Sequence, residues 1–414
     1  MPEEFEIREP RPNELRDLSL LPSSALRGSR IGDDEWPETE VSWRYQRTLA
    51  AWSSATGRPV ALVAGFPFET TIPGGGTLAT LGVTRVTVAA THRRRGLLRA
   101  LLDRLLSDSR AGGVPIASLW ASETGIYGRF GFGVATEMTS LGIDPARIRP
   151  LAETAGAATG SVRLLRPEEV LATVAPIYAR SRRRAGSVDR PEWMWRRFYK
   201  QAITVDGDQW VGVHSDADGV DDGFVHYRVA LDESTVTLRG EVLELWAVSP
   251  QVEVELWRYV AGIDLADRWR RHNAPVDDVL RAVARDPRGV GVEKRWDELW
   301  LRLLDVHAAL TARSYGPADG AVTIAVDDDR YPGNSGAWVI SPSGAERAPS
   351  GVVPDLSCPV ATIGAAYLGG TSWHDLWVAG RVQVHDRAAF DHGVLARADA
   401  LFSVRPLPWC GTHF

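Results

Sequence analysis

The most informative segment of the sequence is residues 86–99, which read Val86-Thr87-Val88-Ala89-Ala90-Thr91-His92-Arg93-Arg94-Arg95-Gly96-Leu97-Leu98-Arg99. Its β-branched beginning is typical of a strand that starts near Leu81. Adjacent leucine pairs then recur every four residues up to Leu106, which predicts an amphipathic helix that ends at Gly112. A strand, a basic loop and a helix therefore follow one another directly.

The loop between that strand and that helix has the properties of an anion-binding site. Backbone N–H groups in the first turn of a helix have no partner within the helix, and the helix dipole adds positive charge there. Gly96 lets a pyrophosphate approach the backbone, and Arg94, Arg95 and Arg99 add charge. The alternative is a solvated basic loop before an ordinary helix. The order of strand, loop, glycine and helix favours phosphate binding.

The rest of the chain also mixes strands and helices, which predicts an α/β (α+β) fold in three domains. Small residues at 151–160 indicate a linker, and a loop at 286–289 precedes a third domain that begins with 299–303. The expected domains are residues 1–155, 156–296 and 297–414. Further strands are expected at 43–50, 59–66, 114–120, 209–214, 223–229 and 241–248, and further helices at 168–185, 253–267 and 386–400.

Composition excludes several classes of function. The 414 residues carry 47 basic and 53 acidic side chains, a net charge of -6, which argues against a nucleic-acid-binding protein. No run of eighteen apolar residues predicts a membrane span, and the acidic N-terminus is not a signal peptide, so we expect a cytoplasmic protein. Two cysteines without a CxxC motif, and histidines without ligand spacing, predict no metal site.

Two motifs resemble a known family. Arg93-x-x-Gly96-x-Leu98 is similar to the acetyl-CoA loop of GNAT acetyltransferases, although Leu98 stands where that loop has glycine or alanine. Together with the strand at 82–88 and the string Glu123-x-x-Ile126-Tyr127-Gly128-Arg129-Phe130-Gly131, it resembles the enhanced intracellular survival family of aminoglycoside N-acetyltransferases over the whole chain. The resemblance implies an N-terminal GNAT domain, a second GNAT-like domain without cofactor, and a sterol-carrier-protein-like C-terminal domain.

The resemblance also implies roles for single residues. The backbone of the strand end would hold the acetyl group and pantetheine arm, the loop and helix start would cradle the pyrophosphate, and the next strand would end in the same cleft. In that order, the acetyl-CoA-binding residues would be Val86, Thr87 and Val88, then Arg94, Arg95, Gly96, Leu97, Leu98 and Arg99, then Ser122 and Glu123.

Transfer of an acetyl group to an amine requires an acid and a base. The resemblance implies that Tyr127 is the general acid and that the C-terminal carboxylate, here that of Phe414, is the base. A phenol is protonated and an α-carboxylate ionised at neutral pH. Without the family resemblance, the sequence favours a packed aromatic residue at Tyr127 and a frayed C-terminus.

The acceptor is implied to be an amine of an aminoglycoside or similar polyamine, in a homohexamer. Acidic candidates for its pocket are Asp33, Asp34 and Glu35 beside Trp36, with a solvated loop as the alternative; His413 stands where the family can have an acidic residue. Two other functions compete: acetylation of lysines in proteins or peptides, and a non-catalytic module that binds a lipid or a partner.

Overall fold

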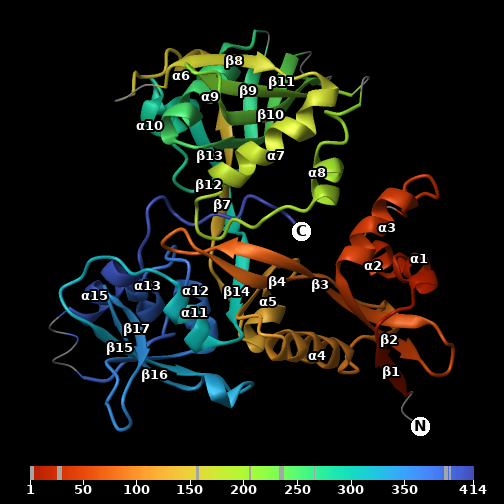
Figure 1. Ribbon diagram of the computed structural model, residues 1–414, viewed down its shortest axis with the longest axis vertical. Coiled ribbons are helices and arrows are strands. Elements are labelled where there is room, and N and C mark those ends of the chain that lie inside the picture. The colour runs from red at the N-terminus through yellow and green to blue at the C-terminus, as the bar shows by residue number, and fades with distance from the viewer. Residues whose placement is uncertain are drawn as a thin grey trace. The chain divides into compact units, whose positions relative to one another are not determined.

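The computed structural model describes residues 4–25, 30–154, 158–204, 207–232, 237–264, 266–386, 390 and 393–414. It divides into two compact units. The first unit comprises Met1–Ala135, Leu299–Val404 and His413–Phe414, and the second comprises Thr136–Glu298 and Arg405–Thr412. Both units combine sheets with helices, which confirms the expected α/β (α+β) class (Figure 1). No helix among these residues is long and apolar enough to cross a bilayer.

The main sheet of the first unit has the strand order β1-β2-β3-β4-β5-β14-β6 among the described residues. Only β4 and β5 pair in parallel in this sheet, and the other neighbours are antiparallel. The strands are β1 (Phe5–Arg8), β2 (Arg47–Ser53), β3 (Pro59–Thr71), β4 (Thr77–Val88), β5 (Ile116–Trp120), β6 (Gly133–Val134) and β14 (Leu299–Leu303).

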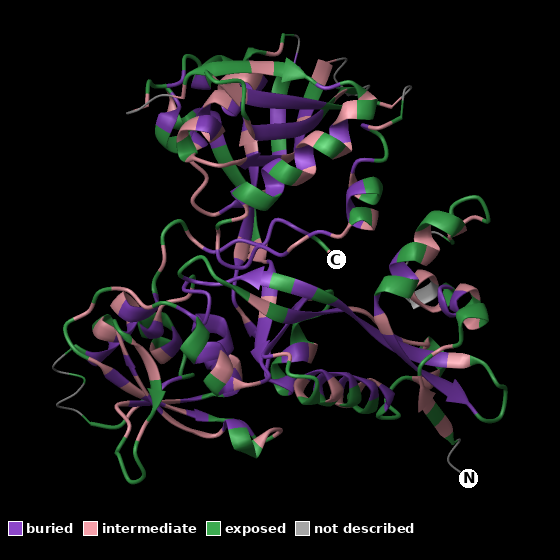
Figure 2. Cartoon of the chain, in the orientation of Figure 1, coloured by how far each residue is buried: buried purple, intermediate pink, exposed green. Residues whose placement is uncertain are grey.

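Helix α4 (Leu97–Ala111) connects β4 to β5 and packs on β2, β3 and β4. The leucine pairs of the sequence explain this packing, because Leu101, Leu102, Leu105 and Leu106 are all completely buried. Figure 2 shows the buried residues alternating with exposed ones along this helix. The other helices beside this sheet are α1 (Leu15–Leu18), α2 (Leu20–Ala25), α3 (Trp36–Tyr45) and α5 (Thr124–Tyr127).

A smaller sheet in the first unit has the order β17-β16-β15-β18-β19. Its helix α12 contacts strands β14 and β6 of the main sheet. The strands are β15 (Val322–Asp327), β16 (Gly336–Ser341), β17 (Gly344–Arg347), β18 (Leu356–Pro359) and β19 (Gln383–Val384); the helices are α11 (Val306–Ala312), α12 (Val360–Ala366), α13 (Trp373–Val378) and α15 (Val394–Phe402).

The second unit is built on one sheet with the order β13-β7-β12-β11-β10-β9-β8. Helix α9 covers a core that includes Val225, Tyr227 and Trp269. The strands are β7 (Glu137–Ile143), β8 (Gly160–Leu164), β9 (Gln209–Asp216), β10 (Asp221–Asp232), β11 (Thr237–Ala247), β12 (Ala266–Pro275) and β13 (Val290–Asp297); the helices are α6 (Pro145–Ile148), α7 (Val170–Ser181), α8 (Glu192–Phe198), α9 (Pro250–Gly262) and α10 (Leu280–Val283).

Two strands lie outside the sheets to which the expected domain limits assign them. Strand β7 belongs to the sheet of the second unit, although the first domain was expected to reach residue 155. Strand β14 pairs with β5 and β6 of the first sheet, although it was expected to begin the third domain. Strand length and composition do not reveal which sheet a strand joins, because pairing is a long-range property.

Local predictions differ from the structure in three further places. The expected strand at 43–50 is divided, because residues 43–45 end helix α3 and β2 begins only at Arg47. The expected helix at 253–267 ends at Gly262, before β12 begins. Within the expected helix at 386–400, residues 387–389 and 391–392 lie outside the described residues, and α15 begins at Val394.

The C-terminal segment is bound to the second unit by a buried carboxylate. Glu298 is completely buried, and its carboxylate accepts hydrogen bonds from the backbone N–H groups of Cys410, at 2.9 Å, and Gly411, at 2.8 Å, and from the Thr136 hydroxyl at 2.8 Å. Burial raises the pKa of Glu298 to about 7, although these hydrogen bonds by themselves lower it. The segment is therefore held by a group that titrates near neutral pH.

Arg190 holds the other side of the same segment. Its guanidinium donates to the Gly411 carbonyl at 3.2 Å and to the Thr412 hydroxyl at 2.9 Å, and it pairs with Glu244 at 2.9 Å. Residues 408–412 are all buried. This part of the tail is consequently a packed element of the second unit, unlike the frayed ends that are usual in proteins.

Replacing Glu298 by glutamine is expected to change how stability depends on pH. The folded-state pKa of about 7 lies above the ordinary value of 4.5, so the folded state keeps a proton that the unfolded chain loses. The free energy of unfolding should therefore fall as pH rises from 4.5 to 7, by up to about 3 kcal/mol from this group, and stay level above pH 7. Glutamine does not titrate, so Glu298→Gln should lack this fall.

Urea unfolding of both proteins at pH 5 and pH 8, followed by tryptophan fluorescence, measures the difference. The matched control is Glu192→Gln, because the Glu192 carboxylate is exposed and pairs with Arg196 on the surface. An identical stability difference between wild type and Glu298→Gln at the two pH values would show that Glu298 does not titrate in this range.

Candidate active site

Strands β4 and β5 diverge at the centre of the first sheet. Their parallel pairing runs from Thr80 opposite Ile116 to Val83 opposite Leu119, and β4 then continues to Val88 without β5. A parallel pair that separates in this way leaves a gap between the strands. The backbone of β4 beyond Val83 borders that gap.

A β-bulge turns β4 at the point where the gap opens. Leu62 pairs with Thr87 and Ala64 with Thr84, so one residue of β3 faces two of β4 there. Arg85, within the bulge, has a positive φ of 53°. Its guanidinium is fixed by hydrogen bonds to Gln46 at 2.9 Å and Ser42 at 3.1 Å. The bulge thereby reorients the backbone of residues 86–88.

Helix α4 begins without a side-chain cap. Its N-cap is Gly96, with a left-handed φ of 79°, and no side chain accepts a hydrogen bond from the first N–H groups. A Cβ atom added to Gly96 would meet no other atom within 4 Å, so the space above it is open. Arg94 and Arg99 are exposed beside it. An uncapped helix start flanked by arginines favours an anion.

A cavity of about 630 Å³ joins the strand end, the loop and the helix start. Every residue expected to contact acetyl-CoA lines it, and so does Tyr127. The expected residues are Val86, Thr87, Val88, Arg94, Arg95, Gly96, Leu97, Leu98, Arg99, Ser122 and Glu123. The structure adds His92, Arg93, Ile126, Arg129 and Phe130, which the sequence analysis did not assign to the site. These residues lie within or next to the two sequence motifs, and that position in the sequence could have identified them as site residues.

Tyr127 ends helix α5 and is 3% exposed. Burial is the main cause that raises the pKa of its phenol, and the nearby carboxylate of Glu123 raises the pKa further, while a hydrogen bond with Ser122 lowers it. The ring packs edge-on against Phe132 at 6.2 Å. Tyr127 is therefore both a packed aromatic residue and a protonated hydroxyl in the cavity wall.

His413 and Phe414, the last two residues, lie against the main sheet of the first unit. The Phe414 ring is 4.9 Å from the Phe68 ring, and a Cβ atom at Gly82 would come within 3.1 Å of Phe414 and 2.5 Å of Phe68. The His413 ring is 4.8 Å from Trp120. Neither residue is among the described residues that line the cavity. Gly82 lies four residues before Val86 on β4, so the chain end is placed upstream of the strand end.

The acidic candidates for an amine pocket lie elsewhere in the first unit. Asp33 forms an ion pair with Arg16 at 2.7 Å, and Glu35 accepts from the Gly32 N–H at 3.1 Å. Trp36 packs against a separate apolar cluster and under the Arg16 guanidinium. None of these residues, nor Asp34, is part of the described cavity lining.

Among its described residues, the second unit has no equivalent of this helix start. Its corresponding helix, α9, is capped by Ser249, whose hydroxyl accepts from the Val252 N–H at 3.3 Å. Pro250 at its first position has no N–H group to offer. A side-chain cap and a proline thus occupy the place that Gly96 leaves open in the first unit.

Three family profiles match the chain in the expected order. Residues 6–135 and 186–313 each match the family described as acetyltransferase (GNAT) domain, and residues 306–411 match the sterol carrier protein domain. The predicted succession of two GNAT-like domains and a sterol-carrier-like domain is confirmed.

Full-length relatives show the same relationship. N-acetyltransferase Eis of Mycobacterium tuberculosis is 34% identical over 387 residues, which cover 89% of this chain and 90% of that protein. An uncharacterized N-acetyltransferase of Streptomyces coelicolor is 37% identical over 378 residues, 88% of this chain and 89% of the relative. The crystal structure of Eis1 from Mycobacterium abscessus matches with a TM-score of 0.84 and 32% identity, covering 99% of this chain and 100% of that one.

Proposed function

Because this chain belongs to the Eis family of GNAT N-acetyltransferases, we propose that it transfers the acetyl group of acetyl-CoA to an amine of an aminoglycoside or a similar polyamine. That it is an acetyl-transferring enzyme follows from the family. The observation that carries the proposal is the single cavity wall shared by the end of β4, the uncapped start of α4 and the Tyr127 hydroxyl.

Acetyl-CoA fits this cavity as the donor substrate. Its pyrophosphate would accept hydrogen bonds from the free N–H groups of residues 96–99, with Arg94, Arg95 and Arg99 supplying charge. The backbone of residues 86–88, which borders the gap beside β5, would bind the pantetheine arm and polarise the thioester carbonyl. Ser122 and Glu123 would form the opposite wall.

Direct transfer needs two proton movements. The attacking amine forms a C–N bond to the carbonyl carbon and loses a proton to a base, and the C–S bond breaks as the thiolate accepts a proton. We assign Tyr127 as the acid, because its raised pKa keeps the hydroxyl protonated at neutral pH. We assign the carboxylate of Phe414 as the base, because that residue packs against Phe68 of β3 and beside Gly82 of β4 rather than fraying.

A row of aromatic rings supports a cationic acceptor. Tyr45, Phe66, Phe68 and Phe414 follow one another with ring centroids 6.4, 5.5 and 4.9 Å apart. Phe66 and Phe68 are buried, so only the partly exposed rings of Tyr45 and Phe414 can meet an ammonium group, at about 0.5–1 kcal/mol each. Polyamines and peptide lysines both carry such groups, so acetylation of a protein or peptide lysine is the second candidate. Assembly as a homohexamer is carried over from the family as a prediction.

Gly96→Asp is expected to abolish measurable binding of acetyl-CoA. The new carboxylate would enter the open space above the helix start and repel the pyrophosphate. The matched control is Gly113→Asp at the other end of α4. Gly113 has the same kind of positive φ, 82° against 79°, and the same open surroundings.

Isothermal titration calorimetry with acetyl-CoA distinguishes the two variants. Wild type and Gly113→Asp should bind one equivalent per chain, since α9 of the second unit is capped. A second equivalent that binds wild type as tightly as the first, or unchanged affinity in Gly96→Asp, would refute this assignment of the donor site.

Tyr127→Phe should lower kcat by about 10²–10⁴-fold and leave the Kd for acetyl-CoA unchanged, because only the donated proton is lost. The control Tyr331→Phe removes another hydroxyl of the first unit that hydrogen-bonds Ser107 outside the cavity. Thiol release in the presence of an aminoglycoside measures both. Since burial raises the pKa of Tyr127, any decline of wild-type activity through ionisation of this group should come at a higher pH than for a solvent-exposed phenol. Equal kcat in the two variants would leave Tyr127 a packing residue.

Converting the Phe414 carboxylate to an amide should cause a loss of turnover comparable to that of Tyr127→Phe. The amide keeps the shape of the chain end and removes only its charge, so acetyl-CoA affinity should not change. Phe414→Leu, which keeps the carboxylate and loses the contact with the Phe68 ring, serves as the control and should lose less activity. Full activity of the amide at neutral pH would assign the base to another group.

A further inference from the structure

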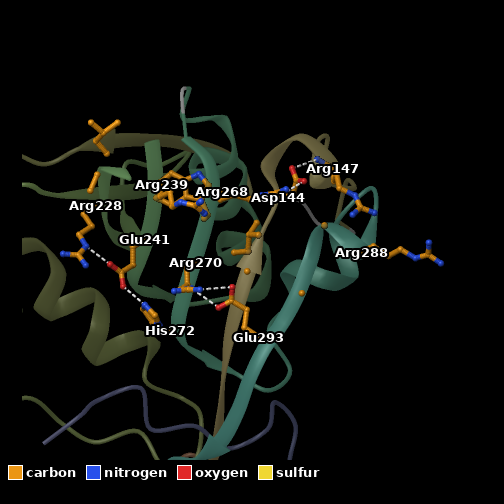
Figure 3. Close-up of a pocket in the computed structure, with 18 residues that line it drawn as sticks. Asp144, Arg147, Arg228, Arg239, Glu241, Arg268, Arg270, His272, Arg288 and Glu293 are labelled. Atoms are coloured by element: carbon orange, nitrogen blue, oxygen red, sulfur yellow. Dashed lines mark hydrogen bonds and ion pairs between the residues drawn. The ribbon is translucent and has the colours of Figure 1, made fainter. Parts of the chain in front are cut away.

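A second cavity, of about 930 Å³, lies within the second unit on the sheet of β13, β7, β12, β11 and β10 (Figure 3). It is larger than the donor cavity and no part of the acetyl-transfer chemistry uses it. Its charged lining consists of Arg147, Arg228, Arg239, Arg268, Arg270, Arg288, His272, Asp144, Glu241 and Glu293.

The alternation of side chains along the strands explains why these charges share one face. Tyr227 and Trp269 point into the core beneath α9, so their neighbours Arg228, Arg268 and Arg270 point to the opposite face. Arg239 and Arg268 are partners in the parallel register of β11 and β12, as are Glu241 and Arg270. The sheet therefore carries rows of guanidinium groups across adjacent strands.

Carboxylates hold these guanidinium groups without saturating them. Glu241 accepts from Arg228 at 2.6 Å and faces His272 at 2.9 Å, and Figure 3 shows it between the two. Glu293 pairs with Arg270 at 2.8 Å and Asp144 pairs with Arg268. An arginine has five N–H donors, and one carboxylate uses at most a few of them. The ion pairs thus orient arginines that keep further donors.

Among the described residues of the lining, arginines outnumber carboxylates. Six arginines face three carboxylates in the lining, and Asp286, which pairs with Arg147 at 2.6 Å, raises the acids to four. All six arginines are exposed. Clustered and preoriented guanidinium groups commonly bind phosphate groups through bidentate hydrogen bonds.

The floor of the cavity is open backbone. Gly142 on β7 and Gly291 on β13 are partners in the antiparallel register, and the Glu293 side chain lies over Gly142, 2.7 Å from where its Cβ atom would stand, whereas Gly291 is uncovered. A Cβ atom at Gly291 would meet only the Gly142 carbonyl, at 3.8 Å. Its neighbour Val290 points into the core beneath α9, so a larger side chain at 291 would point the opposite way, into the cavity that Gly291 lines.

This cavity is not the counterpart of the donor site. It borders residues 239–241, where β11 is still paired with β12, whereas the counterpart of the donor loop would be residues 248–250 before α9. We propose that the second unit binds a small molecule that carries several phosphate groups and is of about nucleotide size. The volume lies within the range of about 300–1,000 Å³ typical of ligand sites.

Isothermal titration calorimetry with inorganic tripolyphosphate tests the proposal on the full chain. All proteins carry Gly96→Asp, which removes phosphate binding at the donor loop. The triple variant Arg239→Gln/Arg268→Gln/Arg270→Gln should raise the Kd by at least about tenfold, as expected for losing several charge-assisted hydrogen bonds. Gly291→Val, which changes no charge, should weaken binding similarly by filling the floor.

The matched control is Arg163→Gln/Arg196→Gln/Arg281→Gln, which removes three exposed arginines of the same unit outside this cavity. It should bind tripolyphosphate as the Gly96→Asp parent does. The proposal is wrong if the parent binds no tripolyphosphate, or if the control triple variant weakens binding as much as the cavity triple variant. It is also wrong if Gly291→Val binds like the parent while circular dichroism shows both variants folded.

Discussion

The free N–H groups at the start of α4 are the feature on which the rest of the site depends. They remain available because Gly96 ends the loop in a left-handed conformation and brings no capping side chain. The buried leucines fix the helix on the sheet, and the bulge of β4, held by Arg85, turns the adjacent backbone toward the gap. An anion at the helix start and a carbonyl at the strand end can consequently be bound by one rigid frame.

The two GNAT-like domains show how a small local change decides whether such a frame binds a donor. In the second domain, Ser249 accepts a hydrogen bond from an N–H group of the first helical turn, and Pro250 has no N–H group. This domain therefore keeps the strand and the helix but lacks the free N–H groups that Gly96 leaves at the start of α4. Its arginines instead gather on the sheet face beside Glu241 and Glu293. The same fold thus carries an uncapped helix start in one domain and rows of arginines on a sheet face in the other.

Much of the site could be predicted from the sequence because its residues are close together in the chain. Residues 86–99 and 122–127 form one strand, one loop and two helix ends, and local propensity governs all of them. The places of β7 and β14 could not be predicted, because sheet membership depends on distant partners. The same holds for Glu298, whose role requires the backbone of Cys410, 112 residues away. His413 and Phe414 were assigned from family likeness, and their contacts with Trp120 and Phe68 are visible only in the fold.

The most direct test of the account is the rate at which purified protein releases thiol from acetyl-CoA when an amine is added. The enzyme is expected to release thiol rapidly when an aminoglycoside is added, and mass spectrometry should detect one mole of acetylated aminoglycoside for each mole of thiol. Thiol release with a lysine-containing peptide should be much slower. Release that is no faster with the aminoglycoside than without it, or that occurs only with the peptide, would contradict the proposed function.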